Sequence, residues 1–423
     1  MKIAVIGTGI SGNFAAARLH PHHDITVFEQ DTRVGGHTHT HNIEIGAERH
    51  AIDTGFIVFN HWTYPNFTAL LDELGVESQQ TAMSFSVRNE RSGLEYNGTD
   101  LNGLFAQRRN LLRPAFLGMI GQILRFNREA PRLLDRPEAQ ALTLGDYLAA
   151  GGYGSAFIHD YLVPMGSAIW STDPERMLRF PAQFFVRFFV NHGMLSVSER
   201  PVWRSVRGGS ARYVERLTEP FRDRIRLDAP VQWVRRLADR VLVKARDAEP
   251  ESFDHVFIAC HADQALALLA DPTLAEREVL GALPYQQNEA VLHTDTALLP
   301  RSRRAWAAWN YHVQGPGQPT ALTYNMNILQ RLESRHTFSV TLNRSDAIDP
   351  ARIIRRIVYH HPLFTPAGVV AQRRQGELNA ARTYYCGAYW RFGFHEDGMA
   401  STLAALRHFE ENAHAQCPLQ RVA

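Results

Sequence analysis

The hydrophobic pattern at the start of the chain predicts a strand, a helix and a second strand in close succession. Residues 2–6 are an apolar run rich in β-branched side chains, which favours a buried strand. Residues 13–19 are mostly helix-forming and include three consecutive alanines. Residues 24–28 are a second apolar run, and it ends on Glu29. The order of these elements is typical of a βαβ unit.

The turn after the first strand carries glycines at the spacing that a dinucleotide-binding loop needs. Gly7 permits a tight turn, Gly9 lets the backbone approach a pyrophosphate, and Gly12 lets the helix pack against the strand. The free N–H groups at the helix start can bind phosphate charge. Glu29 ends the second strand, where an acid can accept hydrogen bonds from ribose hydroxyls and repel a 2′-phosphate. The pattern predicts a dinucleotide site of the FAD or NAD type, not of the NADP type.

The segment after Glu29 favours FAD over NAD. It resembles the Glu-x5-Gly-Gly extension of the flavoprotein group that contains monoamine oxidase, phytoene desaturase and protoporphyrinogen oxidase. In that group the double glycine, here Gly35-Gly36, passes along the FAD pyrophosphate, and an arginine usually follows it. This chain has His37 there instead. Arg33 is either a second phosphate contact or a solvated loop residue.

Further segments resemble the same group. Residues 51–58 resemble the stretch near the isoalloxazine ring, 229–231 the strand whose valine meets the adenine, and 253–260 a buried strand of the FAD domain. Residues 383–399 resemble the carboxyl-terminal cap, in which a helix beginning near Gly398 should aim its positive end at the flavin. The group usually has Ala-Gly-Asp before that helix, whereas this chain has Cys-Gly-Ala at 386–388. The aspartate that holds the ribityl chain is therefore missing, and Asp397 and Glu396 are candidates to replace it.

The FAD contacts that these resemblances imply extend over most of the chain. The cofactor is expected to bind non-covalently, and the implied contacts are Gly7, Gly9, Ile10, Ser11, Gly12, Glu29, Gln30, Arg33, Gly35, Gly36, His37, Thr38, Gly55, Phe56, Ile57, Val231, Ala259, Cys260, Gly387, Ala388, Asp397, Gly398 and Met399.

A narrower resemblance covers nearly the whole chain. It is to a family of bacterial predicted NAD/FAD-binding oxidoreductases, often described alongside cyclopropane-fatty-acid synthase-like methyltransferases. The segments that carry it are 164–171, 200–210, 285–288, 292–295, 309–311, 386–390 and 393–398. It implies flavin chemistry on an unsaturated or methylated acyl chain, with a lipid methyltransferase as a potential partner.

The fold class that these features imply is α/β. We expect a Rossmann-like FAD-binding domain of the glutathione-reductase and amine-oxidase type, formed by residues 1–85, 200–275 and 375–423. We expect residues 86–199 and 276–374 to form an interleaved α+β substrate domain. A second glycine fingerprint is absent from the sequence, which argues against a separate NAD(P)H domain.

The predicted catalytic residues are His395, Glu396, Tyr389 and Trp390. A histidine at position 395 would face the flavin by resemblance and could shuttle a proton or orient a substrate, because its ordinary pKa is near neutrality. It could also simply bond the local backbone. Glu396 and Asp397 could instead act as favourable charges at a helix start. The only lysines, Lys2 and Lys244, lie in predicted strands away from the flavin, which argues against a standard amine oxidase.

Two apolar stretches of the predicted substrate domain have two interpretations each. Residues 111–134 predict a helix that is basic and amphipathic, with arginines at 113, 125, 128 and 132. It is either a solvated helix or a face that docks on an anionic bilayer. Phe184, Phe185, Phe188 and Phe189 are either core residues or the lining of a channel for a long apolar substrate.

Composition narrows the function classes. The chain has 423 residues, 45% of them hydrophobic, and a net charge of +2, so nucleic acid is not an expected partner. Cys260, Cys386 and Cys417 form no CxxC pair, which argues against disulfides and zinc. The alternating histidines at 37, 39 and 41 lack a carboxylate partner, so no metal is expected. Without a leader or an 18-residue apolar run we expect a cytoplasmic protein, with peripheral contact to the inner membrane face as the alternative.

Three functions remain open on this basis. The first is an FAD-dependent enzyme that dehydrogenates, saturates or isomerises an unsaturated or methylated fatty acyl chain. The second is an amine oxidase. The third is a non-catalytic flavin-binding partner of a lipid-modifying complex.

Overall fold

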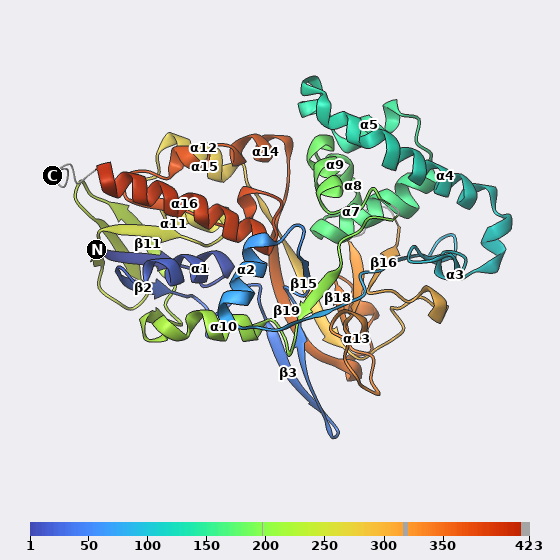
Figure 1. Ribbon diagram of the computed structural model, residues 1–423, viewed down its shortest axis with the longest axis horizontal. Helices are drawn as coiled ribbons and strands as arrows, with labels where there is room; N and C mark the ends of the chain where they lie inside the picture. Colours follow the sequence, from blue (N-terminus) through green and yellow to red (C-terminus); the bar gives the residue numbers. More distant parts are fainter. Residues whose placement is uncertain (197, 316–319, 416–423) are drawn as a thin grey trace.

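A five-stranded parallel sheet lies at the centre of the end of the molecule that holds the amino terminus (Figure 1). The computed structural model describes residues 1–196, 198–315 and 320–415, so Cys417 and the end of the predicted segment 375–423 lie outside the described residues. The sheet has the order β10-β2-β1-β14-β20. Its strands are β1 (Lys2–Ile6), β2 (Asp24–Phe28), β10 (Ile225–Arg226), β14 (His255–Ile258) and β20 (Thr383–Tyr385). This parallel arrangement around β1 and α1 (Ile10–Leu19) confirms the predicted Rossmann-like fold.

Alternate side chains of β1 pack against two different layers. Ile3 and Val5 belong to a core shared with α1 and with α16 (His395–Ala415). Ala4 and Ile6 point to the other face, against a three-stranded antiparallel sheet and α11 (Ala262–Leu268). That small sheet contains β11 (Val231–Arg236), β12 (Val241–Ala245) and β13 (Glu251–Phe253). The period of two in the sequence of β1 thus buries both faces of the central sheet.

A mixed seven-stranded sheet forms the second half of the molecule. Its order is β19-β15-β18-β17-β16-β7-β8, with β16 and β7 parallel and the other neighbours antiparallel. The strands are β7 (Phe85–Asn89), β8 (Leu94–Asn97), β15 (Tyr285–His293), β16 (Trp309–Val313), β17 (Ala321–Asn325), β18 (Ser339–Leu342) and β19 (Ile353–Pro362).

A group of helices packs on this second sheet and forms the end of the molecule away from the amino terminus (Figure 1). They are α3 (Leu101–Leu104), α4 (Pro114–Glu129), α5 (Leu144–Ala150), α6 (Ser155–Phe157), α7 (Val163–Trp170), α8 (Pro174–Leu178) and α9 (Ala182–Asn191). Phe184, Phe185, Phe188 and Phe189 of α9 are all buried in their common core, as the core interpretation predicts. No helix in the described residues is long and apolar enough to cross a bilayer.

Short strands and helices connect the two halves. The strands are β3 (Thr40–Ile45) with β4 (Glu48–Asp53), and β5 (Phe59–Asn60), β9 (Trp203–Val206) and β6 (Ser78–Gln80). The remaining α-helices of the described residues are α2 (Pro65–Leu74), α10 (Ala211–Thr218), α12 (Leu274–Gly281), α13 (Met326–Leu329), α14 (Pro366–Gln372) and α15 (Gln375–Leu378). Val279 of α12 and Ala371 of α14 pack in the core beside β14, although both fall within the predicted substrate-domain range 276–374. The domain boundaries therefore stay a prediction.

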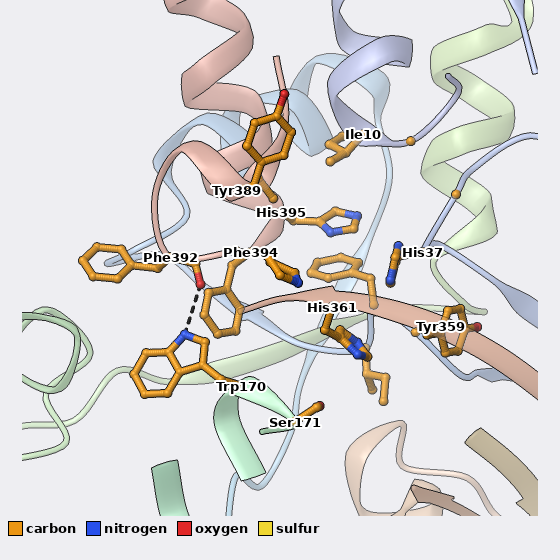
Figure 2. A pocket seen from close by; sticks show the side chains of 18 of the residues that line it. Ile10, His37, Trp170, Ser171, Tyr359, His361, Tyr389, Phe392, Phe394 and His395 are labelled. Carbon is orange, nitrogen blue, oxygen red and sulfur yellow. Dashed lines mark hydrogen bonds between the residues drawn. The ribbon is translucent and has the colours of Figure 1, made fainter. Parts of the chain in front are cut away.

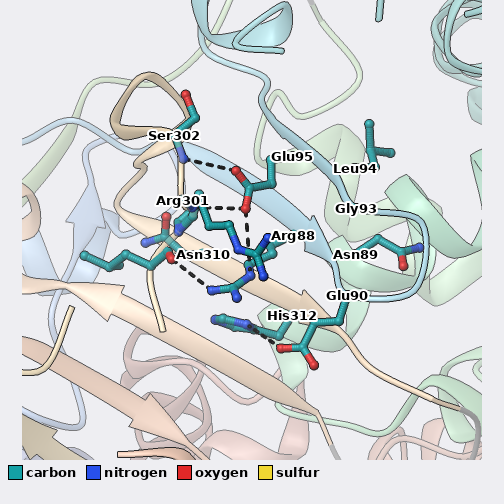
Figure 3. Close-up of polar contacts among 12 residues, drawn as sticks. Arg88, Asn89, Glu90, Gly93, Leu94, Glu95, Arg301, Ser302, Asn310 and His312 are labelled. Carbon is teal, nitrogen blue, oxygen red and sulfur yellow. Dashed lines mark hydrogen bonds and ion pairs between the residues drawn. The ribbon is translucent and has the colours of Figure 1, made fainter. Parts of the chain in front are cut away.

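Polar side chains form a network at the β7–β8 edge of the second sheet, with Glu95 and His312 buried and Glu90 exposed (Figure 3). Glu95 accepts hydrogen bonds from the N–H groups of Arg301 and Ser302, at 3.0 and 3.1 Å. The Arg88 Nε atom lies 3.8 Å from the Glu95 carboxylate, and Nδ1 of His312 lies 3.8 Å from that of Glu90. The carboxylates of Glu95 and Glu90 thus have partners within the protein.

Candidate functional site

The amino terminus of α1 has no side-chain cap. Its N-cap residue is Gly9, whose φ of −64° and ψ of −179° are ordinary extended backbone. A Cβ built on Gly9 meets no atom within 4 Å, so this position opens onto empty space. The uncapped N–H groups of the first turn therefore face a space that an anion can enter.

The other two glycines of the fingerprint are required by packing. Gly7 has a φ of +100°, which a residue with a side chain rarely adopts. A Cβ on Gly12 would lie 1.9 Å from the carbonyl oxygen of Gly7. The loop at Gly36, with a φ of +57°, lies so close that a Cβ there would be 2.9 Å from the Cα of Gly9. Gly9 is therefore enclosed by its neighbours on one side and open on the other.

Glu29 holds this loop in place. One of its carboxylate oxygens accepts hydrogen bonds from the Thr8 N–H, at 2.9 Å, and from the Thr8 hydroxyl. The other accepts from the Asp31 N–H at 3.0 Å. The predicted acid at the end of β2 is thus present and lines the cavity described below. Arg33 donates to the Gly36 and Thr38 carbonyls, so it orders its own loop.

The first turns of α1 and α16 meet, although 385 residues separate their first members. A Cβ on Gly398 would lie 2.8 Å from the Ser11 Oγ atom, and the Thr402 hydroxyl donates to the Ser11 carbonyl at 3.3 Å. The helix begins at His395, which is earlier than the predicted start near Gly398. The two helix starts therefore converge on one place, as the sequence predicts for a single bound nucleotide.

A cavity of about 1300 Å³ runs along these segments. The predicted FAD contacts that line it are Gly7, Gly9, Ile10, Ser11, Glu29, Gln30, Arg33, Gly36, His37, Gly55, Phe56, Ile57, Val231, Ala259, Cys260, Gly387 and Ala388. Burial raises the pKa of the Cys260 thiol to about 12, so this thiol is a weak nucleophile, which fits the prediction of non-covalent binding.

Six predicted FAD contacts do not line the cavity, and their contact with FAD stays a prediction: Gly12, Gly35, Thr38, Asp397, Gly398 and Met399. Gly12 and Gly398 are used for close backbone packing, and Met399 is fully buried in a core beside Phe67. Gly12, Asp397, Gly398 and Met399 lie within the first turns of α1 and α16 and pack against neighbouring elements. Gly35 and Thr38 lie in the loop after β2, where the Thr38 hydroxyl is bonded to Tyr213 and His395.

His395 lies at the cavity wall (Figure 2), and its ring is in contact with Phe56, Thr38 and Tyr213. Its ring stacks on Phe56 with centroids 3.5 Å apart. Its Nε2 atom lies 3.0 Å from the Thr38 hydroxyl and 2.9 Å from the Tyr213 hydroxyl. Burial lowers the pKa of His395 well below its usual value, so the ring stays neutral at physiological pH. The lowered pKa counts against the predicted proton shuttle, and the two hydroxyl contacts favour the predicted orienting role; both roles stay predictions.

Glu396 caps another helix. One of its carboxylate oxygens accepts from the Asn66 N–H and side-chain amide, at 3.1 and 2.5 Å, and the other accepts from the Phe67 N–H at 3.0 Å. These donors form the start of α2, and Glu396 does not line the cavity. This placement counts against the predicted catalytic and ribityl-binding roles of Glu396, because its lone pairs are committed to the helix.

Asp397 closes the first turn of its own helix. Its carboxylate accepts a hydrogen bond from the Phe394 N–H at 2.9 Å. Burial raises the pKa of Asp397 from the usual 3.8 to about 7. This pKa counts against the interpretation that a negative charge on Asp397 stabilises the start of α16, because the carboxyl is protonated below about pH 7.

The raised pKa of Asp397 predicts a specific pH dependence of stability. The folded protein keeps the proton up to about pH 7, whereas the unfolded chain loses it near the usual 3.8. The protonated Asp397 carboxyl therefore contributes in full to the free energy of unfolding below pH 3.8, the pKa in the unfolded chain. This contribution falls as the pH rises and is lost above about pH 7, the pKa in the folded protein. Asp397→Asn keeps the neutral form, so it should match the wild type at low pH and become more stable, by up to about 4 kcal/mol, above pH 7. Urea unfolding across this range measures the difference, and a constant difference at every pH would contradict the assignment.

Of the other two predicted catalytic residues, only one reaches the cavity. Tyr389 lines it, and its hydroxyl is buried with no hydrogen-bond partner in the described structure. Trp390 is buried beside Tyr389 and does not line the cavity. Trp390 is therefore better described as a core residue of the segment before α16.

Aromatic and aliphatic side chains form the far end of the cavity (Figure 2). Tyr161, Met165 and Ile169 follow one another at a spacing of four along α7 and the π-helical turn before it, and all three line the cavity. Trp170 donates from its indole nitrogen to the Phe392 carbonyl at 3.1 Å, which fixes the wall beside them. Phe188 of the predicted phenylalanine group is buried in the core and also lines this end of the cavity, while its role toward an apolar substrate stays a prediction.

A relay of three side chains fixes the proton position on a cavity histidine that the sequence did not single out. The Glu289 N–H donates to the Asn343 side-chain oxygen at 2.9 Å, which leaves the Asn343 amide nitrogen to donate to Asn288 at 2.7 Å. The Asn288 amide nitrogen then lies 2.8 Å from Nδ1 of His361 and must donate to it. Burial lowers the pKa of His361 to about 3, so the ring is neutral and carries its single proton on Nε2.

His361 thus presents a fixed neutral imidazole at the cavity wall. It lies beside His37 and Tyr359 in Figure 2, and the rings of His37 and His361 are 5.5 Å apart. Asn288 lies in a segment that carries the family resemblance, but His361 belongs to a His-His-Pro run with no informative spacing. The described residues contain no group of three side chains arranged to hold a metal ion.

The residues present fit an FAD molecule. The uncapped start of α1 and the open side of Gly9 provide a phosphate cradle, with Glu29 and Gln30 at one end and Val231 beside them for the adenosine. The other end reaches Phe56 and the residues before α16, where a flavin ring would meet the aromatic part of the cavity.

Comparison with known protein families gives a match over most of the chain. A family model described as flavin containing amine oxidoreductase matches residues 10–340. The comparison with curated proteins gives no significant match.

Several solved structures share the fold over nearly the whole chain. Cyclohexylamine oxidase from Brevibacterium oxydans IH-35A is 16% identical, with a TM-score of 0.70 over 97% of this chain and 99% of that one. A fatty acid isomerase from P. acnes that produces CLA is 16% identical, with a TM-score of 0.67 over 96% and 98%. A putative protoporphyrinogen oxidase from Exiguobacterium sp. 255-15 is 18% identical, with a TM-score of 0.67 over 97% and 98%. At these identities the likeness is one of fold.

Proposed function

The chain belongs to the flavin-containing amine oxidoreductase family and is an FAD-dependent oxidoreductase, and from this premise we propose that its substrate is hydrophobic. The substrate class we propose is an unsaturated or methylated fatty acyl chain, which the enzyme dehydrogenates, saturates or isomerises. A lipid methyltransferase partner stays a prediction from the sequence resemblance.

The observation that carries this proposal is the composition of the far end of the cavity. Its lining combines residues of α7, α9 and the second sheet: Phe85, Tyr161, Met165, Ile169, Trp170, Phe188, Met194, Trp309, Tyr324, Phe364, Phe392 and Phe394. The carboxylates that line the cavity, Glu29 and Asp31, both lie at the nucleotide end. A long apolar chain gains free energy from burial against such a wall.

The chain's own residues supply binding and orientation. Bound FAD supplies hydride transfer at its N5 atom. The wall formed by Trp170 and the phenylalanines excludes water from the reacting bond. The Nε2–H group of His361 is a donor fixed by Asn288, and it can orient a polar atom of the ligand at the junction of the two cavity ends.

An amine substrate is the competing assignment, and the family name and cyclohexylamine oxidase both favour it. Two observations count against it. Neither lysine lines the cavity, because Lys2 lies in β1 and Lys244 donates to the Ala248 carbonyl from β12. The substrate end also lacks a carboxylate, in the described residues, to pair with a substrate ammonium. The fatty acid isomerase shares the same fold, so the fold accommodates either class.

The test is anaerobic flavin absorbance of the purified holoprotein in its oxidised and its dithionite-reduced form, together with analysis of the recovered acyl chains. Dehydrogenation should bleach oxidised flavin, saturation should reoxidise reduced flavin, and isomerisation should move a double bond with no net change in the flavin. Unsaturated phospholipids or free fatty acids should give one of these outcomes, whereas cyclohexylamine and putrescine should leave the flavin unchanged. Met165→Glu places a charge in the apolar wall and should lower kcat/KM for the acyl substrate by roughly tenfold or more, while Met165→Leu should change it little. Bleaching by amines alone would refute the proposal, and an unchanged flavin together with unchanged acyl chains would favour a non-catalytic flavin protein.

A further inference from the structure

The helical end of the molecule carries a leucine-rich surface. Leu101, Leu111, Leu112, Leu117 and Leu124 have exposed fractions of 75, 49, 87, 45 and 54%. They belong to α3, to the 3-10 turn at Arg108–Leu112 and to α4, at the end of the long axis away from the amino terminus (Figure 1). We call these five residues the leucine surface. Exposed leucines are this concentrated nowhere else in the described chain.

The outward face of α4 has no charged side chain over its first three turns. Pro114, Leu117, Gly118, Gly121 and Leu124 are exposed, at spacings that place them along one side of the helix. The opposite side is also apolar, and its buried members are Phe116, Met119 and Phe126. A surface helix normally carries polar residues on its outer face. Contacts within this chain therefore do not explain why leucines, and not polar residues, occupy the outer face of α4.

Arginines surround these leucines. Residues 101–136 contain seven arginines and two carboxylates, which leaves a net charge of +5, while the whole chain carries +2. Within the residues described, the ion pairs of this stretch join Glu129 to Arg125 and Arg128. Arg108 and Arg109 donate instead to backbone carbonyls. Most of the positive charge is thus not neutralised inside the protein.

Neighbouring acids do not cancel this charge. Glu90 and Glu95 lie before α3 in the sequence and have other partners. Glu95 is buried beside Arg88 and accepts from the Arg301 N–H, while the exposed Glu90 pairs with Arg344 and lies 3.8 Å from His312 (Figure 3). The surface therefore combines an apolar centre with unpaired cations.

We propose that the leucine surface docks on an anionic lipid bilayer. Apolar side chains flanked by arginines match the interface of such a bilayer, where leucine enters the acyl region and arginine meets lipid phosphate. A second copy of the chain is a poor occupant, because a twofold contact would place arginines against arginines. Nucleic acid is a poor occupant as well, because the centre of the surface is apolar.

The docking surface adjoins the cavity wall. Thr99 lines the cavity, and Leu101, two residues later, belongs to the leucine surface. Docking thus brings the aromatic end of the cavity close to the bilayer, where acyl chains are found. This consequence rests on the proposed function, whereas the docking itself does not.

Vesicle co-sedimentation of the full-length holoprotein tests the docking without using turnover. The protein should bind vesicles that contain phosphatidylglycerol and bind those of pure phosphatidylcholine much less, with binding that weakens as salt is added. Leu112→Glu combined with Leu117→Glu should reduce binding by roughly tenfold or more. Arg108→Ala and Arg109→Ala should each reduce it by about fivefold. All of these side chains are exposed, so the variants should keep the flavin spectrum and thermal stability.

Matched controls lie on α12, on the other half of the molecule (Figure 1). Leu274 is 73% exposed and Arg277 is exposed one turn later, so Leu274→Glu and Arg277→Ala make the same chemical changes outside the surface. These controls should bind as the wild type does. Absent binding to anionic vesicles, equal loss in the controls, or no loss in the surface variants would overturn the proposal. A wild-type dimer that dissociates in Leu112→Glu with Leu117→Glu would overturn it too, because the surface would then cover a second copy.

Discussion

Replacement of Gly9 by glutamate is expected to give a folded protein that no longer retains FAD. A Cβ at this position meets no atom within 4 Å, and the backbone there is ordinary extended chain, so folding tolerates a side chain. The new carboxylate would occupy the space in front of the uncapped start of α1 and repel the pyrophosphate. We expect a loss of FAD affinity of at least about a hundredfold, equivalent to about 3 kcal/mol.

The measurement is flavin content after purification and titration of the apoprotein with FAD, alongside circular dichroism. Gly121→Glu is the matched control, since Gly121 is also open to a Cβ but lies in α4, away from the cavity. It should retain full flavin content. If Gly9→Glu purifies with one FAD per chain, the prediction that the FAD pyrophosphate binds at the start of α1 is wrong.

Replacement of Asn288 by aspartate is expected to abolish most activity while FAD stays bound. The Asn288 amide donates to Nδ1 of His361 and thereby fixes the proton on Nε2. A carboxylate at 288 can only accept, so it would draw the proton to Nδ1 and raise the pKa of His361 above its present value of about 3. The cavity would then face an acceptor or a cation in place of a neutral donor. Loss of one fixed donor predicts a fall in kcat/KM of about a hundredfold.

Three further measurements distinguish this effect from simple misfolding. Asn343 can still donate to an aspartate at 288, so the thermal stability should change little. The rate of the variant should depend on pH in the range where His361 now titrates, whereas the wild type should lack that dependence. His361→Ala should lose a similar amount of activity, and the double variant should lose no more than either. Additive losses would show that the two residues act independently.

The phosphate cradle could be predicted because its requirements are local. Gly7 needs a positive φ and Gly12 needs close packing against that same turn, and both needs arise within a few residues of chain. The same holds for the acid that ends β2 and for the glycine loop that follows it. Each is set by backbone sterics and by the spacing of a few neighbouring residues, so the amino-acid sequence is enough to predict it.

The assignments that the geometry counts against depend on partners far away in the sequence. The Glu396 carboxylate accepts hydrogen bonds from the start of α2, where Asn66 lies 330 residues away in the sequence. The residues around position 396 give no sequence signal for this contact. His395 has an ordinary sequence context, and its pKa is lowered by burial in the folded protein and, to a smaller extent, by the nearby His37. Its chemistry is therefore decided by burial, which a sequence does not display.

The sequence by itself determined the βαβ unit and its phosphate loop, because strand, turn and helix preferences act between near neighbours. The FAD cofactor and the meeting of two helix starts 385 residues apart followed from the family resemblance. Tertiary structure alone decided which titratable groups face the cavity and in what protonation state. The relay from Asn343 through Asn288 to His361 spans 55 and 73 residues of chain at its two steps. Such contacts exist only after β15, β18 and β19 pair in register, so the position of the proton on His361 is a property of the folded sheet.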